Sequence, residues 1–320
     1  MSHGSVLPIA RRLVAGPTVV LLAAGLAGCG GGAVGMGGGD DGKKPVAAAS
    51  SSSPSTSASA PASSSSPSPA STAPQPAGSE PASAEPKGSE AEPAGDGPLR
   101  GKVVVVDPGH NIHNAEHSAE INRQVDIGTG RKECDTTGTE TNSGYAEASF
   151  SLDVAHRLRA ILQSRGAKVV LTHDGDRPYG PCVTERAEIG NKAHGDAAVS
   201  IHADGAEPGQ RGFHVILPAR VRGGAADTAP IVEPSKELGA RVAGNFVKVT
   251  GSAPSNYIGH GTGLDTRGDL GGLNLSTIPK VFIECGNMRD AQDAALLTDG
   301  NWREKAAQGI ADGITDFLHG

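Results

Sequence analysis

Four polar side chains stand where an α/β protein would bring them together for catalysis. His110 and His202 each follow an apolar run typical of a buried strand, and Glu284 ends another such run. Glu147 begins an amphipathic segment typical of a helix. Two histidines and one carboxylate form the ligand set of a catalytic zinc ion, which keeps one coordination position open. The remaining carboxylate would then be free to transfer protons.

Each of these residues also has a purely structural interpretation. A histidine just past a strand is often a turn residue, and an acidic residue at a helix start complements the helix dipole. The joint arrangement favours chemistry, because a carboxylate at the end of a buried apolar run needs a partner. A rival set of His110, His113 and His117 has the three- and four-residue spacing of one helical face. Its segment is rich in asparagine and lacks apolar periodicity, so we favour the first set.

The elements that must position these residues alternate between strand and helix patterns. Continuous apolar runs predict buried strands, and apolar residues at three- and four-residue spacing predict helices. In chain order the patterns predict strand 102–106, helix 147–165, strand 168–172, helix 183–194, strand 197–202, strand 213–217, helix 234–249, strand 280–284 and helix 302–317. This order indicates the α/β class, with a mainly parallel twisted sheet and helices on both faces. The carboxyl edge of such a sheet is where ligands bind, and there the four polar residues would meet.

The cysteines suggest one disulfide in an exported chain. Residues 111–146 predict either a long loop or an excursion with a small hairpin, and segments of this length are usually functional. Cys134 lies in this segment, and Cys182 lies in a second turn-rich loop. These two loop cysteines are the favoured pair. Cys285 ends an apolar run and is expected to be a buried free thiol. Disulfides persist outside the reducing cytosol.

The beginning of the chain predicts a leader. Arg11 and Arg12 precede the apolar run 13–28, which is too short for a spanning helix and predicts a signal peptide over residues 1–28. The run ends in Leu26-Ala27-Gly28-Cys29, which resembles a bacterial lipobox and implies lipid attached to Cys29. A secreted protein in which Cys29 is incidental is the alternative. The paired arginines leave a twin-arginine export route open.

Composition separates a tether from a folded domain. Of the 54 positions in 45–98, 16 are Ser, 13 are Ala and 11 are Pro, and none is Leu, Ile, Met or aromatic. Such a segment cannot bury enough apolar surface to fold, so residues 29–98 are predicted to be a disordered tether and 99–320 one domain. That domain carries 23 basic and 28 acidic residues, and this balance argues against nucleic-acid binding.

The polar residues belong to short motifs that recur in order in a known family. The motifs are Val106-Asp107-Pro108-Gly109-His110, Ser200-Ile201-His202-Ala203 and Ile283-Glu284-Cys285-Gly286-Asn287, with Glu147 ahead of a helix and Arg186 and Asn191 ahead of the third strand. With them the chain resembles the zinc-dependent N-acetylmuramoyl-L-alanine amidases over residues 101–318. The loop cysteines and the long insert resemble exported members without a separate wall-binding module. Cys285 departs from the family pattern, in which an apolar residue is more common.

The resemblance implies hydrolysis of the amide between N-acetylmuramic acid and L-alanine in peptidoglycan. It implies that His110, Glu147 and His202 bind Zn²⁺ and that Glu284 acts as general base and acid. Asp107 would support a ligand or cap a turn, and Arg267 would meet a peptide carboxylate or form a surface salt bridge.

The remaining expectations concern partners and place. We expect a monomer at the outer face of the bacterial cytoplasmic membrane, anchored through Cys29 and acting on the cell wall. The alternatives are a metal- or glycan-binding lipoprotein without catalysis and a zinc hydrolase of a different amide or ester.

Overall fold

The computed structural model describes residues 97–320. The predicted signal peptide, Cys29 and the predicted tether as far as residue 96 lie outside the described residues. Among the residues that are described, no helix is both long enough and apolar enough to cross a membrane.

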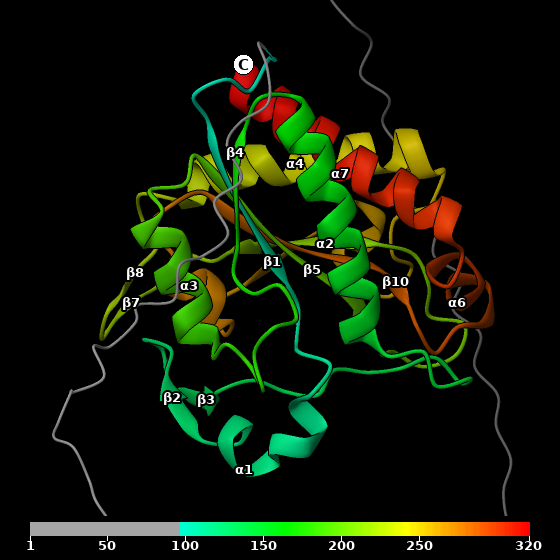
Figure 1. Cartoon of the computed structure of the whole chain (residues 1–320), viewed down its shortest axis with the longest axis horizontal. Coiled ribbons are helices and arrows are strands. Elements are labelled where there is room, and N and C mark those ends of the chain that lie inside the picture. Colours follow the sequence, from blue (N-terminus) through cyan, green and yellow to red (C-terminus); the bar gives the residue numbers. More distant parts are fainter. Residues whose placement is uncertain (1–96) are drawn as a thin grey trace, which may run out of the picture. The chain divides into compact units, whose positions relative to one another are not determined.

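A six-stranded sheet forms the centre of the described part of the chain (Figure 1). The strands lie in the order β4-β1-β5-β10-β6-β9. Every neighbouring pair is parallel except β10 with β6, which confirms the prediction of a mainly parallel sheet. The bounds are β1 Val103–Pro108, β4 Lys168–Leu171, β5 Ala197–Asp204, β6 His214–Pro218, β9 Leu264–Arg267 and β10 Lys280–Asn287.

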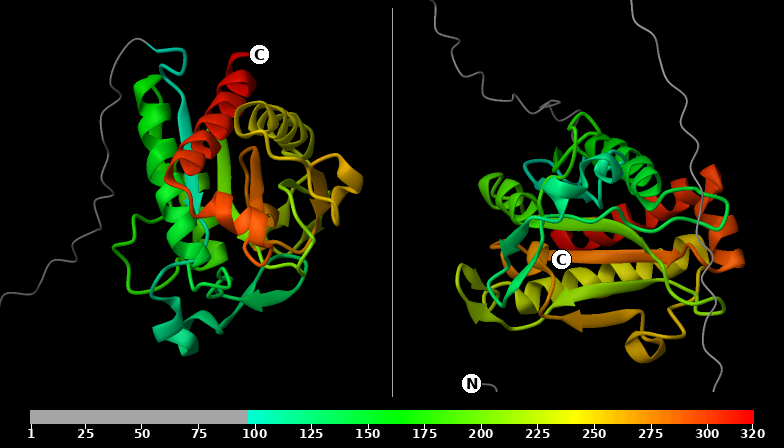
Figure 2. Two further views of the ribbon diagram at one scale, coloured as in Figure 1. Left: turned by 90° about the vertical axis from the view of Figure 1, so that its right-hand side faces the viewer. Right: turned by 90° about the horizontal axis from the view of Figure 1, so that it is seen from below.

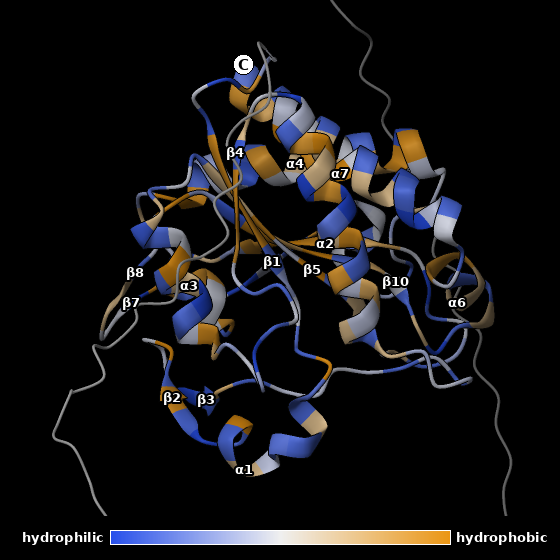
Figure 3. Ribbon diagram, viewed as in Figure 1, coloured by the Kyte–Doolittle hydropathy of each residue, from blue (hydrophilic) through white to orange (hydrophobic). Residues whose placement is uncertain are grey.

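Helices cover both faces of the sheet, as the sequence predicts. The long helices α2 (Glu147–Ser164), α4 (Val232–Thr250) and α7 (Gly300–His319) lie together on one face (Figure 2). They enclose the main core, in which apolar residues of β1, β5 and β10 meet apolar residues of the three helices (Figure 3). On the other face lie α3 (Val183–Lys192) and the short α5 (Gly271–Asn274), and α6 (Ala291–Leu297) packs beside β10. The second face is therefore covered by shorter helices.

Helix α2 shows how the apolar pattern positions a polar residue. Phe150, Val154, Leu158 and Leu162 recur every four residues and are fully buried against the sheet. The helix ends before Gly166, which has a φ of 90°, a left-handed conformation that favours glycine. The buried stripe fixes the rotation of the helix about its axis. As a consequence Glu147, the first residue, points to the carboxyl end of the sheet.

The segment between β1 and α2 forms a small layer of its own. It contains η1 (Asn114–His117), α1 (Ser118–Ile121) and an antiparallel hairpin of β2 (Gln124–Asp126) and β3 (Arg131–Glu133). Of the two alternatives that the sequence left open, the structure therefore shows the excursion with a small hairpin. A second small hairpin pairs β7 (Arg222–Gly223) with β8 (Ala226–Asp227), and η2 (Gly259–Gly261) precedes β9.

One disulfide joins this layer to the second face of the sheet. Cys134, just after β3, is bonded to Cys182, the residue that precedes α3. Cys285 is free and buried in β10. Both outcomes confirm the sequence-based expectation.

Removing the disulfide should destabilise the fold. The bond spans 48 residues. In the chain-entropy model a loop of that length contributes up to about 4 kcal/mol. We expect the Cys134→Ala/Cys182→Ala protein to unfold at a lower urea concentration than the wild type. A reductant should lower the wild-type midpoint and leave that of the double variant in place. An unchanged wild-type midpoint under reductant would contradict the prediction.

Candidate metal and catalytic centre

The four predicted site residues meet on one face of the sheet, near its carboxyl end. His110 follows β1 by two residues and Glu147 begins α2. His202 and Glu284 are paired in register on the neighbouring strands β5 and β10. The structure therefore brings together every residue of the predicted set.

The last two residues sit differently from the prediction. The apolar runs predict strands that end at His202 and Glu284, but β5 continues to Asp204 and β10 to Asn287. The pairing extends because Asn287 still aligns with Asp204 beyond a register shift. Asp204, Gly286 and Asn287 interrupt the apolar runs, so the pattern did not predict these extensions. Hence His202 and Glu284 project from the face of the sheet and not from loops past its edge.

Three side chains of the set form a compact group of potential metal ligands. His110 Nε2 lies 3.1 Å and His202 Nδ1 lies 2.9 Å from Glu147 Oε1. One ligand atom from each residue lies within 4.8 Å of the others. The side chains of His110, Glu147 and His202 are 11%, 6% and 15% exposed, so the group is largely buried but not sealed from solvent. Two imidazoles and a carboxylate facing one point suit a divalent transition metal.

The loop after β3 orients His110. The ring donates its Nδ1 proton to the carbonyl oxygen of Thr136 at 3.0 Å, which leaves Nε2 unprotonated and directed at Glu147. Gly138 of the same loop has a φ of 76°, and a Cβ there would lie 2.8 Å from Glu147 Oε2. Only glycine therefore fits against the group. His110 itself has a φ of 60°, a strained backbone conformation of the kind that collects at functional sites.

The carboxylate of Glu147 is held in its charged form. Oε2 accepts a hydrogen bond from the Thr139 amide at 2.9 Å, and Oε1 accepts one from the Ala203 amide at 3.2 Å. Burial disfavours the charge, but the attraction and hydrogen bonds of His110 and His202 outweigh it and hold the pKa of Glu147 well below its ordinary value. This carboxylate is thus poised to bind a cation.

Glu284 has the opposite environment. Its Oε2 is buried and has no hydrogen-bond partner among the residues described. Burial, together with the negative charges of Glu147 and Asp204, raises the pKa of Glu284 well above its ordinary value, against the attraction of Arg267. Two carboxyl groups of one site with pKa values displaced in opposite directions can take different roles. Glu284 is the one suited to accept a proton and hold it.

The ring of His202 packs against Phe282 and against the backbone at Gly109. It stacks on Phe282, with ring centroids 5.1 Å apart and planes 12° apart. Phe282 lies two residues before Glu284 on β10, so one strand supports the imidazole and carries the second carboxylate. A Cβ on Gly109 would lie 2.3 Å from the ring of His202, so the chain after β1 passes close to this imidazole.

A buried ionic network lies beneath the site. Arg186 donates to Asp107 Oδ1, to Asp135 Oδ2 and to the carbonyl oxygen of His110, each at 2.9 Å. Burial disfavours the Asp107 charge, but Lys280 and Arg186 hold the pKa of Asp107 well below its ordinary value. Asp107 therefore neither caps a turn nor contacts a candidate ligand, and it supports His110 through Arg186. The sequence patterns gave Lys280 no role, and its one signal there is the position of a charged residue at the start of a buried strand.

Truncating Arg186 should destabilise the fold strongly. The Arg186→Leu change leaves the buried charge of Asp135 without its arginine partner, and it leaves Asp107 with Lys280 as its one remaining cation. Breaking a buried ion pair in this way typically lowers the free energy of unfolding by about 3–5 kcal/mol. Arg177→Leu is a matched control, because Arg177 pairs with Glu185 at 36% exposure, where such a pair contributes about 1 kcal/mol or less. Urea unfolding of both proteins measures the two losses. Similar losses in the two variants would overturn the role given to the network.

The other predicted candidates lie outside the centre. His113 and His117 do not belong to the group of potential metal ligands, which is the one such group found in residues 97–320. Arg267 forms a bidentate salt bridge with Asp269, at 2.8 and 2.7 Å, and this confirms the salt-bridge interpretation.

The sequence profile described as N-acetylmuramoyl-L-alanine amidase matches residues 104–316. The chain belongs to this family. Family membership confirms the resemblance to N-acetylmuramoyl-L-alanine amidases and, with it, hydrolysis of an amide bond in peptidoglycan. The amidase Rv3717 of Mycobacterium tuberculosis is 40% identical over 221 residues, which cover 69% of this chain and 88% of the relative.

Solved amidase structures have the same fold. Ami1 of Mycobacterium smegmatis is 40% identical, with a TM-score of 0.63 over 69% of this chain and 98% of that chain. Ami1 of Mycobacterium abscessus, in its apo form, is 39% identical, with a TM-score of 0.63 over 69% of this chain and 100% of that chain. The amidase fold is thus common to all three.

Proposed function

We propose that this amidase cleaves the bond between N-acetylmuramic acid and L-alanine with a zinc ion held by His110, Glu147 and His202. The observation that carries the proposal is the convergence of their three ligand atoms within 4.8 Å of one another. Nitrogen and carboxylate donors in this number, with one side left open, suit zinc. When bound, the ion would supply the Lewis acidity that activates a water molecule and polarises the scissile carbonyl.

Glu284 would move the proton in this reaction. Its carboxylate takes a proton from the attacking water while the hydroxide portion adds to the carbonyl carbon of the lactyl group. The same carboxyl group then returns the proton to the nitrogen of L-alanine, and the carbon–nitrogen bond breaks. A free amine and a free carboxylic acid result. The raised pKa of Glu284 supports this role, because the group must hold the proton between the two steps.

The two histidines and Glu147 would hold the metal ion in place and would take no part in the proton transfer. The Thr136 carbonyl fixes which nitrogen of His110 carries the proton, and the amides of Thr139 and Ala203 fix the Glu147 carboxylate. The burial of the three side chains limits the access of bulk water to them. A metal-binding lipoprotein without catalysis would have no use for Glu284 beside a complete ligand set.

The place of action is part of the proposal. Leu26-Ala27-Gly28-Cys29 and the Cys134–Cys182 disulfide support export, lipid attachment at Cys29 and work on the cell wall. All four chemical groups come from one chain, which supports a monomer as the active unit. The deciding experiment is digestion of purified peptidoglycan and mass spectrometry of the products. Release of free stem peptides that begin with L-alanine, with free lactyl carboxyl groups on the glycan, would support the proposal, and cleavage at a different bond with this amide left intact would refute it.

A further inference from the structure

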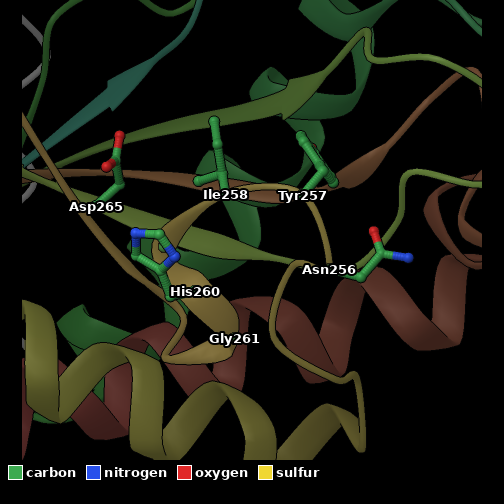
Figure 4. Close-up of a pocket in the computed structure, with 7 residues that line it drawn as sticks. Asn256, Tyr257, Ile258, His260, Gly261 and Asp265 are labelled. Carbon is green, nitrogen blue, oxygen red and sulfur yellow. The ribbon is translucent and has the colours of Figure 1, made fainter. Parts of the chain in front are cut away.

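A polar pocket of about 440 Å³ opens between η2 and β9 (Figure 4). Its size falls within the range of small-molecule sites, about 300–1,000 Å³. The lining consists of Asn256, Tyr257, Ile258, Gly259, His260, Gly261 and Asp265. None of these residues belongs to the candidate metal and catalytic centre.

Tyr257 connects the pocket to the catalytic centre. Its hydroxyl donates to Asp204 Oδ2 at 2.8 Å, two residues beyond His202 on β5. Its ring meets the ring of His214 edge-on, with centroids 6.0 Å apart. His214 is paired in register with Glu284. The pocket therefore borders the catalytic centre on the side of Glu284.

The sheet register gives the distance between Asp265 and Glu284. Asp265 on the edge strand β9 pairs with Ile216, and Ile216 pairs with Phe282, two residues before Glu284. Two strand spacings of about 4.8 Å and a two-residue offset of about 6.8 Å place the backbones of Asp265 and Glu284 about 12 Å apart. Alternation along paired strands puts both side chains on the same face of the sheet.

The charge of the pocket is negative. Asp265 is half-buried, and no hydrogen bond or ion pair engages its carboxylate within residues 97–320. The lining contains neither lysine nor arginine. The nearby Arg267 is already committed to Asp269 through two hydrogen bonds. The Asp265 carboxylate acts on Arg267 and His214 through space, and it helps to raise the pKa of Arg267. Its oxygens accept no hydrogen bond from a described residue, so they are free to accept from a cationic group.

The backbone around His260 is built to a fixed shape. His260 has a φ of 52°, and its neighbours Gly259 and Gly261 have φ values of 68° and 74°. A non-glycine residue in this conformation is strained, and strain of this kind persists where a defined surface is needed. The Thr262 hydroxyl donates to the Gly259 carbonyl at 2.6 Å and ties the turn together.

The substrate offers one cation at a matching distance. Stem peptides of peptidoglycan begin with L-alanine and glutamate and carry a diamino acid as the third residue. Along an extended chain the third residue lies about 10 Å from the cleaved amide, and its side chain extends further. With the L-alanine nitrogen at Glu284, the side-chain amine of the third residue can reach Asp265.

We propose that this pocket is the subsite for the diamino acid of the stem peptide and that Asp265 binds its side-chain ammonium group. The proposal rests on the proposed amidase function and names the part of the substrate that determines specificity. Tyr257 and Ile258 provide apolar surface for the methylene groups of that side chain, and Asn256 offers an amide for its peptide bonds.

Three synthetic substrates test the subsite. They are a muramoyl dipeptide that lacks the third residue, a muramoyl tripeptide with a free side-chain amine, and the same tripeptide with that amine acetylated. We expect the kcat/KM of the wild type to be about 10- to 100-fold higher for the free amine than for the acetylated form. This factor corresponds to the usual contribution of one hydrogen bond to a charged group. Asp265→Asn should lose this preference, and Asp265→Glu, which keeps the charge, should retain most of it.

Controls separate the subsite from the chemistry. Asp227→Asn alters an exposed carboxylate on β8, outside the pocket lining, and should keep the wild-type preference. The proposal would be overturned if Asp265→Asn kept the full preference for the free amine. It would also be overturned if this variant lost the same factor in kcat/KM on the dipeptide as on the tripeptide. Cleavage of the dipeptide by the wild type reports the amidase function alone. Calorimetry of the two tripeptides with Glu284→Gln protein measures binding at the subsite without turnover. A failure of the subsite proposal can therefore be told apart from a failure of the proposed amidase function.

Discussion

Glu284→Gln should lower the rate of stem-peptide release by about 10²–10⁴-fold while zinc stays bound. Glutamine is nearly the same size as glutamate but cannot accept a proton at neutral pH. The three candidate ligands are untouched, so metal content should stay at the wild-type level. Release of free stem peptide from purified peptidoglycan gives the rate, and elemental analysis of the same preparation gives the zinc content.

A control variant and two opposing outcomes make this result decisive. Glu207→Gln removes an exposed carboxylate outside the catalytic centre and should leave the rate unchanged. Wild-type activity in Glu284→Gln would remove Glu284 from the mechanism. Loss of zinc in that protein would make Glu284 a ligand and not the proton carrier.

His202→Ala should reduce bound zinc from about one ion per chain to nearly none, because a catalytic zinc site relies on three protein ligands. The change also removes the 2.9 Å contact between His202 Nδ1 and Glu147 Oε1, while Oε1 keeps the hydrogen bond from the Ala203 amide. Activity should fall with the metal. Dialysis against a defined zinc concentration followed by elemental analysis measures the loss, and circular dichroism checks that the fold survives.

His113→Ala is the matched control for that experiment. His113 belongs to the rival histidine set of the sequence, yet the structure leaves it outside the ligand group. The control protein should keep its zinc. Full zinc retention by His202→Ala would refute the ligand set, and zinc loss in His113→Ala would revive the rival.

The spacing of apolar residues predicted most of the fold, because the main strands and helices bury apolar residues at regular intervals. Helix α2 and strand β1 are examples, since almost every inward position is apolar. Strand β9 was missed for the opposite reason: Leu264 is its one apolar residue among four, and its place at the sheet edge requires few. Short elements held by tertiary contacts leave no periodic signal.

The residues of the catalytic centre were predictable because each ends or begins a patterned element. Their surroundings were not. Arg186 reaches Asp135, 51 positions away, and Tyr257 reaches Asp204, 53 positions away. Contacts between segments so distant in sequence depend on the packed fold. The pocket that contains Asp265 could not be predicted for the same reason, since its lining combines the strained turn around His260 with strand β9, which the sequence pattern did not predict.

The Cys134–Cys182 bond turns residues 134–182 into a covalent ring, and Glu147 lies inside that ring. A protease that cuts one peptide bond within the ring cannot separate the chain into two molecules. The piece that carries His110 and the piece that carries His202 and Glu284 stay joined through sulfur. In a cell wall exposed to foreign proteases, a single nick therefore leaves all four groups on one covalently linked molecule, and on a gel the nicked protein separates into fragments only after reduction.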